Sequence, residues 1–375
     1  MCFLLTMAAK NTCDFSVMSL NVRGLNCFKK RKSIFRWLQK KNNSLVFLQE
    51  THSTAETANI WARDWKGKIV FSHGTSNSKG CMILVKEGFD LEITFVKCDN
   101  KGRFVLLKGQ VQGEPTILLN VYAPNTENEQ VEFFKDIDHV LHSNNISNHD
   151  EIVIGGDWNL VHDFNLDKGG GIYNPKLKSI DKLDQLMANY ELHDVWRIKN
   201  PNTKRYSWRQ PNPLIQCRLD YFLISDSLYD TVTQVDIIPS VRSDHSAITI
   251  KFKSIQDTAR GPTFWKFNCS LLDNNDYVSK MKNNINLWKG EYNNDDKRVE
   301  WEFIKYKIRK FTVEFGKKEK LVKRDKELEL EKKLIILERN LKTLKDQTDY
   351  DETKRQLQNI EDEKTMGTIV RSRVE

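Results

Sequence analysis

The sequence changes character near residue 254, and this change divides the chain into two parts. From Phe15 to Lys253, short runs rich in Val, Ile, Leu and Phe alternate with turns and with a few amphipathic segments. That pattern predicts many short strands with helices between them. Strands and helices mixed in this way form either two stacked sheets or a sheet covered by helices. We therefore expect an α/β domain over residues 15–253.

The expected strands are short, and most end at a turn or a polar residue. They are Phe15–Val22, Ser44–Gln49, Cys81–Val85, Phe104–Val111, Thr116–Tyr122, Glu151–Ile154, Arg218–Ile224 and Ala247–Phe252. Helices are expected at Lys30–Lys40, Glu127–Leu141 and Ser179–Tyr190. A β-hairpin is expected within Tyr206–Ile224, with Pro211–Ile215 near its tip.

The second part of the chain predicts a charged helical extension. We expect residues 1–14 to be unstructured, 254–263 to form a linker broken by Gly261-Pro262, and 264–375 to be helical. Leucines in this part follow a heptad spacing. They are Leu330, Leu334, Leu337, Leu341 and Leu344, with Leu357 and Ile360 extending the seam after Asp346–Asp351. A helical hairpin or a dimeric coiled coil explains the seam, and its shortness favours the hairpin.

The net charge indicates the kind of partner, and the cysteines indicate the cellular compartment. The net charge of +8 favours a polyanionic partner, because neutralised phosphates release counterions. The 7 cysteines are scattered and none forms a C-x-x-C pair, which argues against a zinc site and suits a reducing compartment. No apolar run approaches the roughly 20 residues that span a bilayer. We expect a soluble intracellular protein with no membrane partner.

Polar residues stand where three of the expected strands end. Asn21 closes the first strand, Glu50 directly follows the second, and Tyr122 closes a strand before Pro124. A carboxylate such as that of Glu50 is a ligand that Mg²⁺ prefers, and a phenol can donate to a phosphate oxygen. A strand-end turn, an exposed glutamate and a tyrosine at the rim of the core explain the same residues individually.

Two further stretches contain acids, an asparagine and a histidine. The apolar strand Glu151–Ile154 leads into two glycines, then Asp157 and Asn159. Side chains two positions apart on an extended chain point the same way. Asp157 could therefore activate water while Asn159 orients it. The two glycines would let the backbone approach the substrate closely. His245 needs a group to orient it, and Asp220 is the expected partner because a charge within a strand is costly unless paired.

Taken together, these residues suit attack by water on a phosphodiester. The set holds carboxylates, one imidazole, amides and a phenol, and we find no Walker loop and no G-x-S-x-G motif. A metal ion would neutralise phosphate charge, an aspartate would activate water, and the histidine would stabilise the pentacovalent state.

In this order and at these intervals, five stretches resemble the endonuclease/exonuclease/phosphatase superfamily. They are Asn21–Leu25, Leu48–His52, Tyr122–Pro124, Gly155–Asn159 and Ser243–Ile248. The resemblance covers about Phe15–Lys253. It implies a four-layered α/β sandwich of two stacked mixed sheets flanked by helices, which here would precede the helical extension. It also implies a metal-dependent phosphodiesterase, a hydrolase that uses Mg²⁺ or Mn²⁺ in its place.

The resemblance also implies a role for each matched residue. Asn21 and Glu50 look like metal-site residues, and Asp244 looks like an adjacent acid that assists the metal. Tyr122 looks like the residue that contacts phosphate. Asp157 and Asn159 look like the pair that activates water, and His245 looks like the catalytic histidine with Asp220 as its partner.

The sequences of these five stretches are most similar to those of the endonuclease of non-LTR (LINE-type) retrotransposons. Tyr206–Arg209 and Cys217–Ser225 also fit that branch, and Arg260–Leu272 resembles the linker that precedes the reverse transcriptase in such polyproteins. We therefore expect a nuclear enzyme that nicks double-stranded DNA to leave a 3′ hydroxyl. It would be a truncated element-derived reading frame or an endonuclease fragment, with element RNA or the absent reverse transcriptase region as further partners.

Alternative interpretations remain within and outside this branch. An exonuclease III-like abasic-site repair endonuclease would carry the same catalytic set, and an inactive relic could act through its helical tail alone. The superfamily also contains inositol-phosphate phosphatases, sphingomyelinases and deadenylases, which the surplus of basic residues disfavours.

Phosphate contacts position a nuclease on DNA. Three arginines around the expected hairpin are the candidates for such contacts: Arg205, Arg209 and Arg218.

Overall fold

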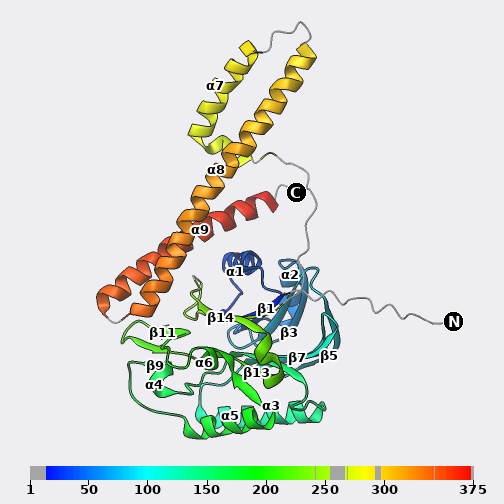
Figure 1. Ribbon diagram of the computed structural model, residues 1–375, viewed down its shortest axis with the longest axis vertical. Helices are drawn as coiled ribbons and strands as arrows, with labels where there is room; N and C mark the ends of the chain where they lie inside the picture. The colour runs from blue at the N-terminus through cyan, green and yellow to red at the C-terminus, as the bar shows by residue number, and fades with distance from the viewer. Residues whose placement is uncertain are drawn as a thin grey trace, which may run out of the picture. The chain divides into compact units, whose positions relative to one another are not determined.

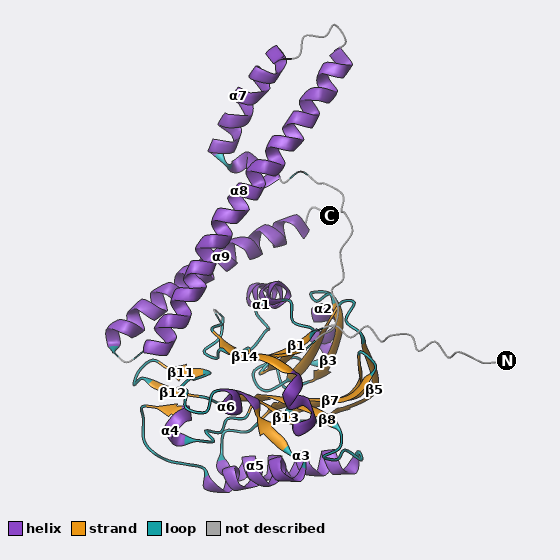
Figure 2. Ribbon diagram, in the orientation of Figure 1, coloured by secondary structure: helices purple, strands orange, loops and turns teal. Residues whose placement is uncertain are grey.

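The computed structural model describes residues 14–240, 242–253, 267, 269–291, 297–341 and 343–372 (Figures 1 and 2). Contacts divide the chain into two compact units, the first formed by Met1–Asp257 with Leu334–Glu375 and the second by Thr258–Lys333. The predicted helical extension is therefore shared between the units. Most of the predicted N-terminal segment and the whole predicted linker lie outside the described residues. The domain boundaries themselves stay predictions.

The first unit contains two six-stranded mixed sheets and a small third sheet. The first sheet has the order β14-β15-β1-β2-β4-β3. Its strands are β1 (Phe15–Asn21), β2 (Leu45–Gln49), β3 (Gly67–Ser72), β4 (Cys81–Lys86), β14 (Val232–Ile238) and β15 (Ala247–Phe252). All neighbours pair antiparallel except β1 and β2, which are parallel.

The second sheet has the order β10-β13-β8-β7-β6-β5, and only β7 and β8 pair in parallel. Its strands are β5 (Leu91–Cys98), β6 (Phe104–Val111), β7 (Glu114–Tyr122), β8 (Glu151–Asp157), β10 (Leu192–Asp194) and β13 (Asp220–Ser225). The third sheet consists of β9 (Lys168–Gly169), β11 (Trp208–Gln210) and β12 (Ile215–Cys217). The antiparallel pair β11–β12 confirms the predicted hairpin.

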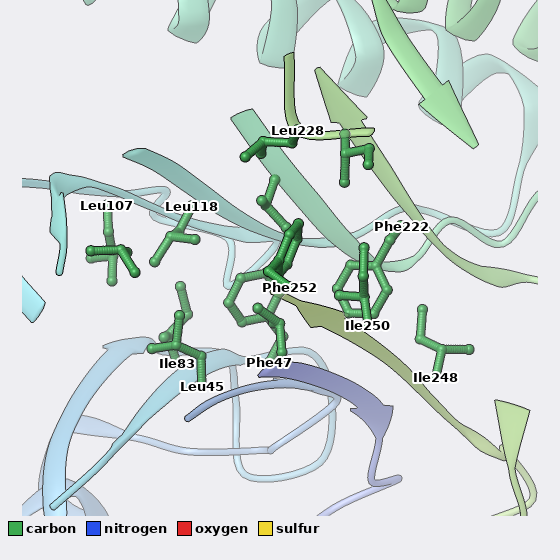
Figure 3. Close-up of a cluster of buried hydrophobic side chains, with 14 of the residues drawn as sticks. Leu45, Phe47, Ile83, Leu107, Leu118, Phe222, Leu228, Ile248, Ile250 and Phe252 are labelled. Atoms are coloured by element: carbon green, nitrogen blue, oxygen red, sulfur yellow. The ribbon is translucent and has the colours of Figure 1, made fainter. Parts of the chain in front are cut away.

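The two large sheets pack face to face through one apolar core. Figure 3 shows side chains of both sheets meeting there, with Phe47 and Ile83 from the first and Leu118 and Phe222 from the second. Helices α1 (Phe28–Lys41) and α2 (Ala55–Ala62) contribute to the core on the outer face of the first sheet. Helices α3 (Glu127–Ser143) and α5 (Leu177–Asn189) cover the outer face of the second. This is the expected four-layered α/β sandwich.

The topology brings the functional strand ends to one edge of the sandwich. Parallel β1 and β2 end together at Asn21 and Gln49, and parallel β7 and β8 end together at Tyr122 and Asp157. Strand β13 runs opposite to β8, so its first residue, Asp220, pairs with Asp157. Residues as far apart in sequence as Asn21 and Asp220 therefore meet at this edge.

Short helices occupy connections of the first unit, and two longer ones belong to its C-terminal part. The short ones are α4 (Phe164–Asp167), α6 (Val195–Lys199) and the 3₁₀ helix η1 (Asp226–Thr231). The C-terminal part, from residue 334 onward, contains the last turns of α8 (Lys297–Asn340) and the whole of α9 (Leu344–Ser372). Helix α8 ends at Asn340 and α9 begins at Leu344. Asp346–Asp351 lie inside α9, so the boundary between the two helices comes earlier than the sequence suggested.

The second unit is a helical hairpin with its own apolar cluster. It contains η2 (Cys269–Asp273), α7 (Asn275–Glu291) and α8 up to Lys333. Tyr277 packs edge-on against Phe315, and its hydroxyl lies 2.7 Å from that of Thr312. Coiled-coil pairing between chains stays a prediction. Among the described helices, none is long and apolar enough to cross a membrane.

Candidate active site

Three predicted residues form one hydrogen-bonded network at the strand ends. Asn21 is fully buried at the end of β1, and its amide nitrogen Nδ2 donates to Glu50 Oε1 at 2.9 Å and to Asp157 Oδ2 at 2.8 Å. The chain turns sharply after β2, and Glu50 has a positive φ of 50°. This turn points the carboxylate back toward Asn21. One amide therefore holds two carboxylates that come from different sheets.

Tyr122 joins the same network from the end of β7. Its hydroxyl donates to Glu50 Oε1 at 2.9 Å, and the guanidinium of Arg103 lies 4.8 Å from the centre of its ring. Burial, followed by the negative charge of Glu50, raises the pKa of Tyr122 far above its ordinary value. The phenol is therefore neutral at every ordinary pH and can act only as a neutral hydrogen-bond donor or acceptor.

His245 and Asp220 form the predicted pair. Nδ1 of His245 lies 2.8 Å from Asp220 Oδ2, and its Nε2 lies 3.9 Å from Asp157 Oδ2. Burial alone would lower the pKa of His245, but the charges of Asp220 and Asp157 raise it to about 10. Because the carboxylate of Asp220 accepts from Nδ1, Nε2 is the ring nitrogen directed at the centre of the site.

Asp244 lies at the rim of the site rather than within the network. Its carboxylate oxygen Oδ2 accepts from Arg23 Nη1 at 2.9 Å and from Trp208 Nε1 at 3.3 Å. Burial opposes ionisation of this group, but the charges of His245 and Arg23 outweigh it and lower its pKa. Asp244 is therefore an ionised acid beside the site, and its predicted assistance to a metal stays a prediction.

The oxygen atoms of the network fit a hard divalent cation. Two carboxylates, Glu50 and Asp157, share the neutral amide of Asn21, and the imidazole of His245 lies on the Asp157 side, with Nε2 3.9 Å from Oδ2. Burial, and then the charge of Asp220, raise the pKa of Asp157 to about 7. Carboxylate and amide oxygens are the ligands that Mg²⁺ prefers. The oxygens of Glu50 and Asn21 would therefore suit a Mg²⁺ ion.

A second group of ligand atoms lies next to the first. One atom each of Asp157, Asp220 and His245 fall within 4.8 Å of one another, which is close enough to hold an ion. However, Nδ1 of His245 is already bound to Asp220, and Mg²⁺ binds oxygen in preference to imidazole nitrogen. We therefore favour Glu50 with Asn21 as the cation site and interpret Asp220–His245 as a proton-holding pair.

The stretch Gly155–Asn159 differs in two ways from its sequence interpretation. A side chain on Gly155 would collide with the ring of Phe222, and one on Gly156 with the carbonyl of Val121. The glycines are thus needed for packing against neighbouring strands, not for approach to a substrate. Asn159 is not on extended chain, since its φ is 48°, and its Nδ2 donates to Ala123 O at 2.8 Å. Its backbone N–H donates to Asp157 Oδ1 at 3.0 Å, which fixes that carboxylate.

The three arginines predicted to contact DNA are instead engaged with carboxylates. Arg218 is 1% exposed and donates to Asp167 at 2.7 and 2.8 Å and to Asp194 at 2.6 Å. Arg205 and Arg209 both form ion pairs with Glu338. In the structure these guanidinium groups hold carboxylates in place, and direct phosphate contacts by them stay a prediction. Their partners lie far away in sequence, so no local pattern could reveal them.

Sequence reasoning missed several residues that support the site. The hydroxyl of Ser207 accepts from the backbone N–H groups of Leu219 and Asp220 at 2.9 and 3.0 Å, which holds Asp220 in place. Between the sheets, Gln49 Nε2 donates to Asn120 Oδ1 at 2.6 Å. Both amides are fully buried, and a polar residue inside an apolar strand was the signal that could have identified Asn120.

Comparison with known proteins agrees with this geometry. The model of the endonuclease/exonuclease/phosphatase family matches residues 18–245, a span that contains the whole site. The chain is 28% identical over 368 residues to the "Transposon TX1 uncharacterized 149 kDa protein" of Xenopus laevis. This match covers 96% of the chain but only 28% of the Xenopus protein.

Solved structures share the fold at low sequence identity. The AP endonuclease from Leishmania major superimposes with a TM-score of 0.55 at 18% identity, covering 64% of this chain and 88% of that one. An AP endonuclease from Archaeoglobus fulgidus gives 0.53 at 17% identity, covering 64% and 99%. The shared fold agrees with the family match. The chain belongs to the endonuclease/exonuclease/phosphatase family.

Proposed function

We propose that the chain is a Mg²⁺-dependent DNA endonuclease that nicks one strand and leaves a 3′ hydroxyl. The observation that carries the proposal is the convergence of Glu50, Asn21, Asp157 and the Asp220–His245 pair at one edge of the sandwich. These residues offer oxygens that would hold a cation, a carboxylate that would act as a base and an imidazole that would donate a hydrogen bond, which are the groups that hydrolysis of a phosphodiester requires.

Each residue has a distinct role in this proposal. Asp157, with a pKa near 7, accepts the proton of the attacking water, and the backbone N–H of Asn159 orients its carboxylate. His245 Nε2 presents a positively charged N–H to a phosphoryl oxygen, where negative charge increases during attack. The hydroxyl of Tyr122, which donates to Glu50 Oε1 in the structure, would turn to the phosphate when substrate is bound. Glu50 and Asn21 would hold Mg²⁺, which supplies positive charge next to the phosphate when it is bound.

DNA is the substrate that the comparisons favour. The Xenopus relative is a transposon protein by its name, and both structural neighbours are AP endonucleases by their titles. The net charge of +8 also suits a polyanion. We infer an origin in a non-LTR retrotransposon, with nuclear localisation, and with element RNA and a reverse transcriptase region as further partners.

The proposal is tested by nicking of supercoiled plasmid. Wild-type protein should convert plasmid to the open circle in Mg²⁺, the nick should prime extension by a polymerase, and Asp157→Ala or His245→Ala should abolish both. Absence of nicking by folded wild-type protein would contradict the proposal and favour the relic. A second arm compares intact duplex with a duplex holding one abasic site, because the structural neighbours suggest that alternative. A strong preference for the abasic duplex would identify a repair enzyme.

A further inference from the structure

The C-terminal residues of the first unit contact the nuclease next to its catalytic loop. Glu338, in the last turns of α8, is buried, and its Oε1 accepts from the hydroxyl of Ser246 at 2.7 Å. Ser246 directly follows His245. The same carboxylate forms ion pairs with Arg205 and Arg209 at the base of the β11–β12 hairpin. One side chain from the tail thus joins two segments of the nuclease.

These two segments are already coupled to each other at the site. Trp208 in β11 forms an isolated β-bridge with His245, and Ser246 N donates to Ser207 O at 2.6 Å. Trp208 Nε1 also donates to Asp244 Oδ2 at 3.3 Å. A shift of the hairpin would therefore move the loop that carries the catalytic histidine.

Three further contacts join the tail, residues 334–372, to the β11–β12 hairpin and to the loop that carries His245. Gln216 Nε2, in β12, donates to Leu341 O at 3.3 Å, close to where α9 begins beside the hairpin (Figure 1). The guanidinium of Arg209 lies 3.8 Å from the centre of the Tyr350 ring. On the other segment, Lys354 Nζ donates to Ser243 O at 2.7 Å. The tail therefore binds both the hairpin and the catalytic loop, each at more than one point.

Charge explains why Glu338 is the critical residue of this contact. The side chains of Arg205 and Arg209 are 4% and 10% exposed, and that of Glu338 is 1% exposed. Without the carboxylate, two guanidinium groups would remain buried beside each other with no opposite charge at that point. Removing one partner of a buried ion pair is costly because the other charges stay out of water. Repulsion between these two guanidinium groups would then shift the base of the β11–β12 hairpin.

We propose that Glu338 is a positioning residue for the nuclease, holding the β11–β12 hairpin and the His245 loop in one arrangement. Residues 334–372 are then part of the nuclease and not an independent appendage. Glu338 does not touch the reacting atoms but acts through Ser246 and the two arginines. This inference rests on the proposed endonuclease activity.

The test uses the full chain with Glu338→Gln and, as a matched control, Glu329→Gln, whose glutamate is exposed on the same helix. Two quantities are measured on one end-labelled duplex: kcat against KM, and the distribution of nick positions. Hydrogen-bond partners that orient metal ligands cost about 10- to 100-fold when changed, and we take the lower end of that range for Glu338. We expect Glu338→Gln to lower kcat by about tenfold. KM for DNA should be nearly unchanged, because the change affects the reacting groups and not the binding of DNA. The nick positions should broaden.

The distribution of nicks separates positioning from simple stabilisation. A loss of folded protein lowers the rate but leaves the distribution unchanged, so an unchanged distribution with a normal kcat per folded molecule would overturn the inference. If Glu338→Gln does not fold, Lys354→Met tests the other contact between the tail and the His245 loop, at Ser243, and should broaden the distribution too. Wild-type nicking in Mg²⁺ is the reference: its absence defeats the proposed function, whereas nicking with unaffected variants defeats only this inference.

A double variant tests whether Glu338 and Ser246 act together. Ser246→Ala removes the 2.7 Å hydrogen bond and leaves both arginine ion pairs in place. If the hydroxyl works through Glu338, the double variant should be no slower than Glu338→Gln alone. Losses that multiply would show independent action and would contradict the proposed route from the tail to His245.

Discussion

At the residue scale, the active site works through the charges that its members impose on one another. Asp220 and Asp157 keep His245 protonated, with a pKa near 10, although burial opposes this. Burial and Asp220 in turn raise the pKa of Asp157 to about 7, where a carboxylate becomes a useful base at neutral pH. A single change of charge should therefore alter both the donor and the base.

Asp220→Asn is predicted to lower the nicking rate by about 100-fold or more, the contribution typical of a general acid–base group. The amide cannot neutralise the imidazolium, so the pKa of His245 falls and its Nδ1 proton is no longer fixed. Initial rates at saturating Mg²⁺ measure this effect, with Asp230→Asn as control because Asp230 is exposed in η1. A variant as fast as wild type would show that His245 needs no carboxylate partner.

At the element scale, buried ion pairs fasten the connections around the second sheet. Arg218, just before β13, reaches Asp167 at the end of α4 and Asp194 at the end of β10. Arg197 of α6 pairs with the same Asp167. One aspartate thus ties α4 to α6 and to the chain entering β13, the strand that carries Asp220.

Arg218→Ala is predicted to destabilise the fold by about 3–5 kcal/mol, because it leaves the carboxylates buried without their main partner. Urea unfolding measures the change, and DNA affinity of the remaining folded protein should be unaltered. The opposite result, normal stability with weakened DNA binding, would restore the phosphate contact that the sequence suggested.

The same ion pair predicts how stability depends on pH. Burial opposes ionisation of Asp167, but the hydrogen bonds and charges of Arg218 and Arg197 outweigh it and lower its pKa. The stabilisation is therefore complete above the unfolded pKa of about 3.9 and is lost as the pH falls through the lower folded value. The difference in unfolding free energy between wild type and Asp167→Asn should shrink from pH 7 to about pH 3. A constant difference would show that Asp167 is not stabilised as a carboxylate.

At the scale of the whole molecule, the sequence predicted what lies in the core and missed what lies at the edges. The apolar runs that formed β2, β4 and β8 were recognised because both faces of these strands are covered. Strands β3, β5 and β14 were missed, and each is an edge strand. In β5 most side chains are exposed, and polar residues interrupt the apolar pattern.

The residues of the candidate site could also be predicted only where the local sequence signals them. Asn21, Glu50, Tyr122 and Asp157 could be predicted because each follows or ends a recognisable strand, and the fold brings them together. The partners of the arginines could not be predicted, since Glu338 is 129 positions from Arg209. Only the folded chain shows that basic residues around the hairpin neutralise buried acids.

The most direct test of the account is the Mg²⁺ dependence of plasmid nicking by wild type and Glu50→Gln. Glu87→Gln is the control, since Glu87 is exposed after β4. The account predicts nicking by wild type in Mg²⁺, none in EDTA, and a much higher Mg²⁺ requirement for Glu50→Gln, because its amide is a weaker ligand than a carboxylate. Equal Mg²⁺ dependence of all three proteins, or nicking that survives EDTA, would contradict a cation held at Glu50.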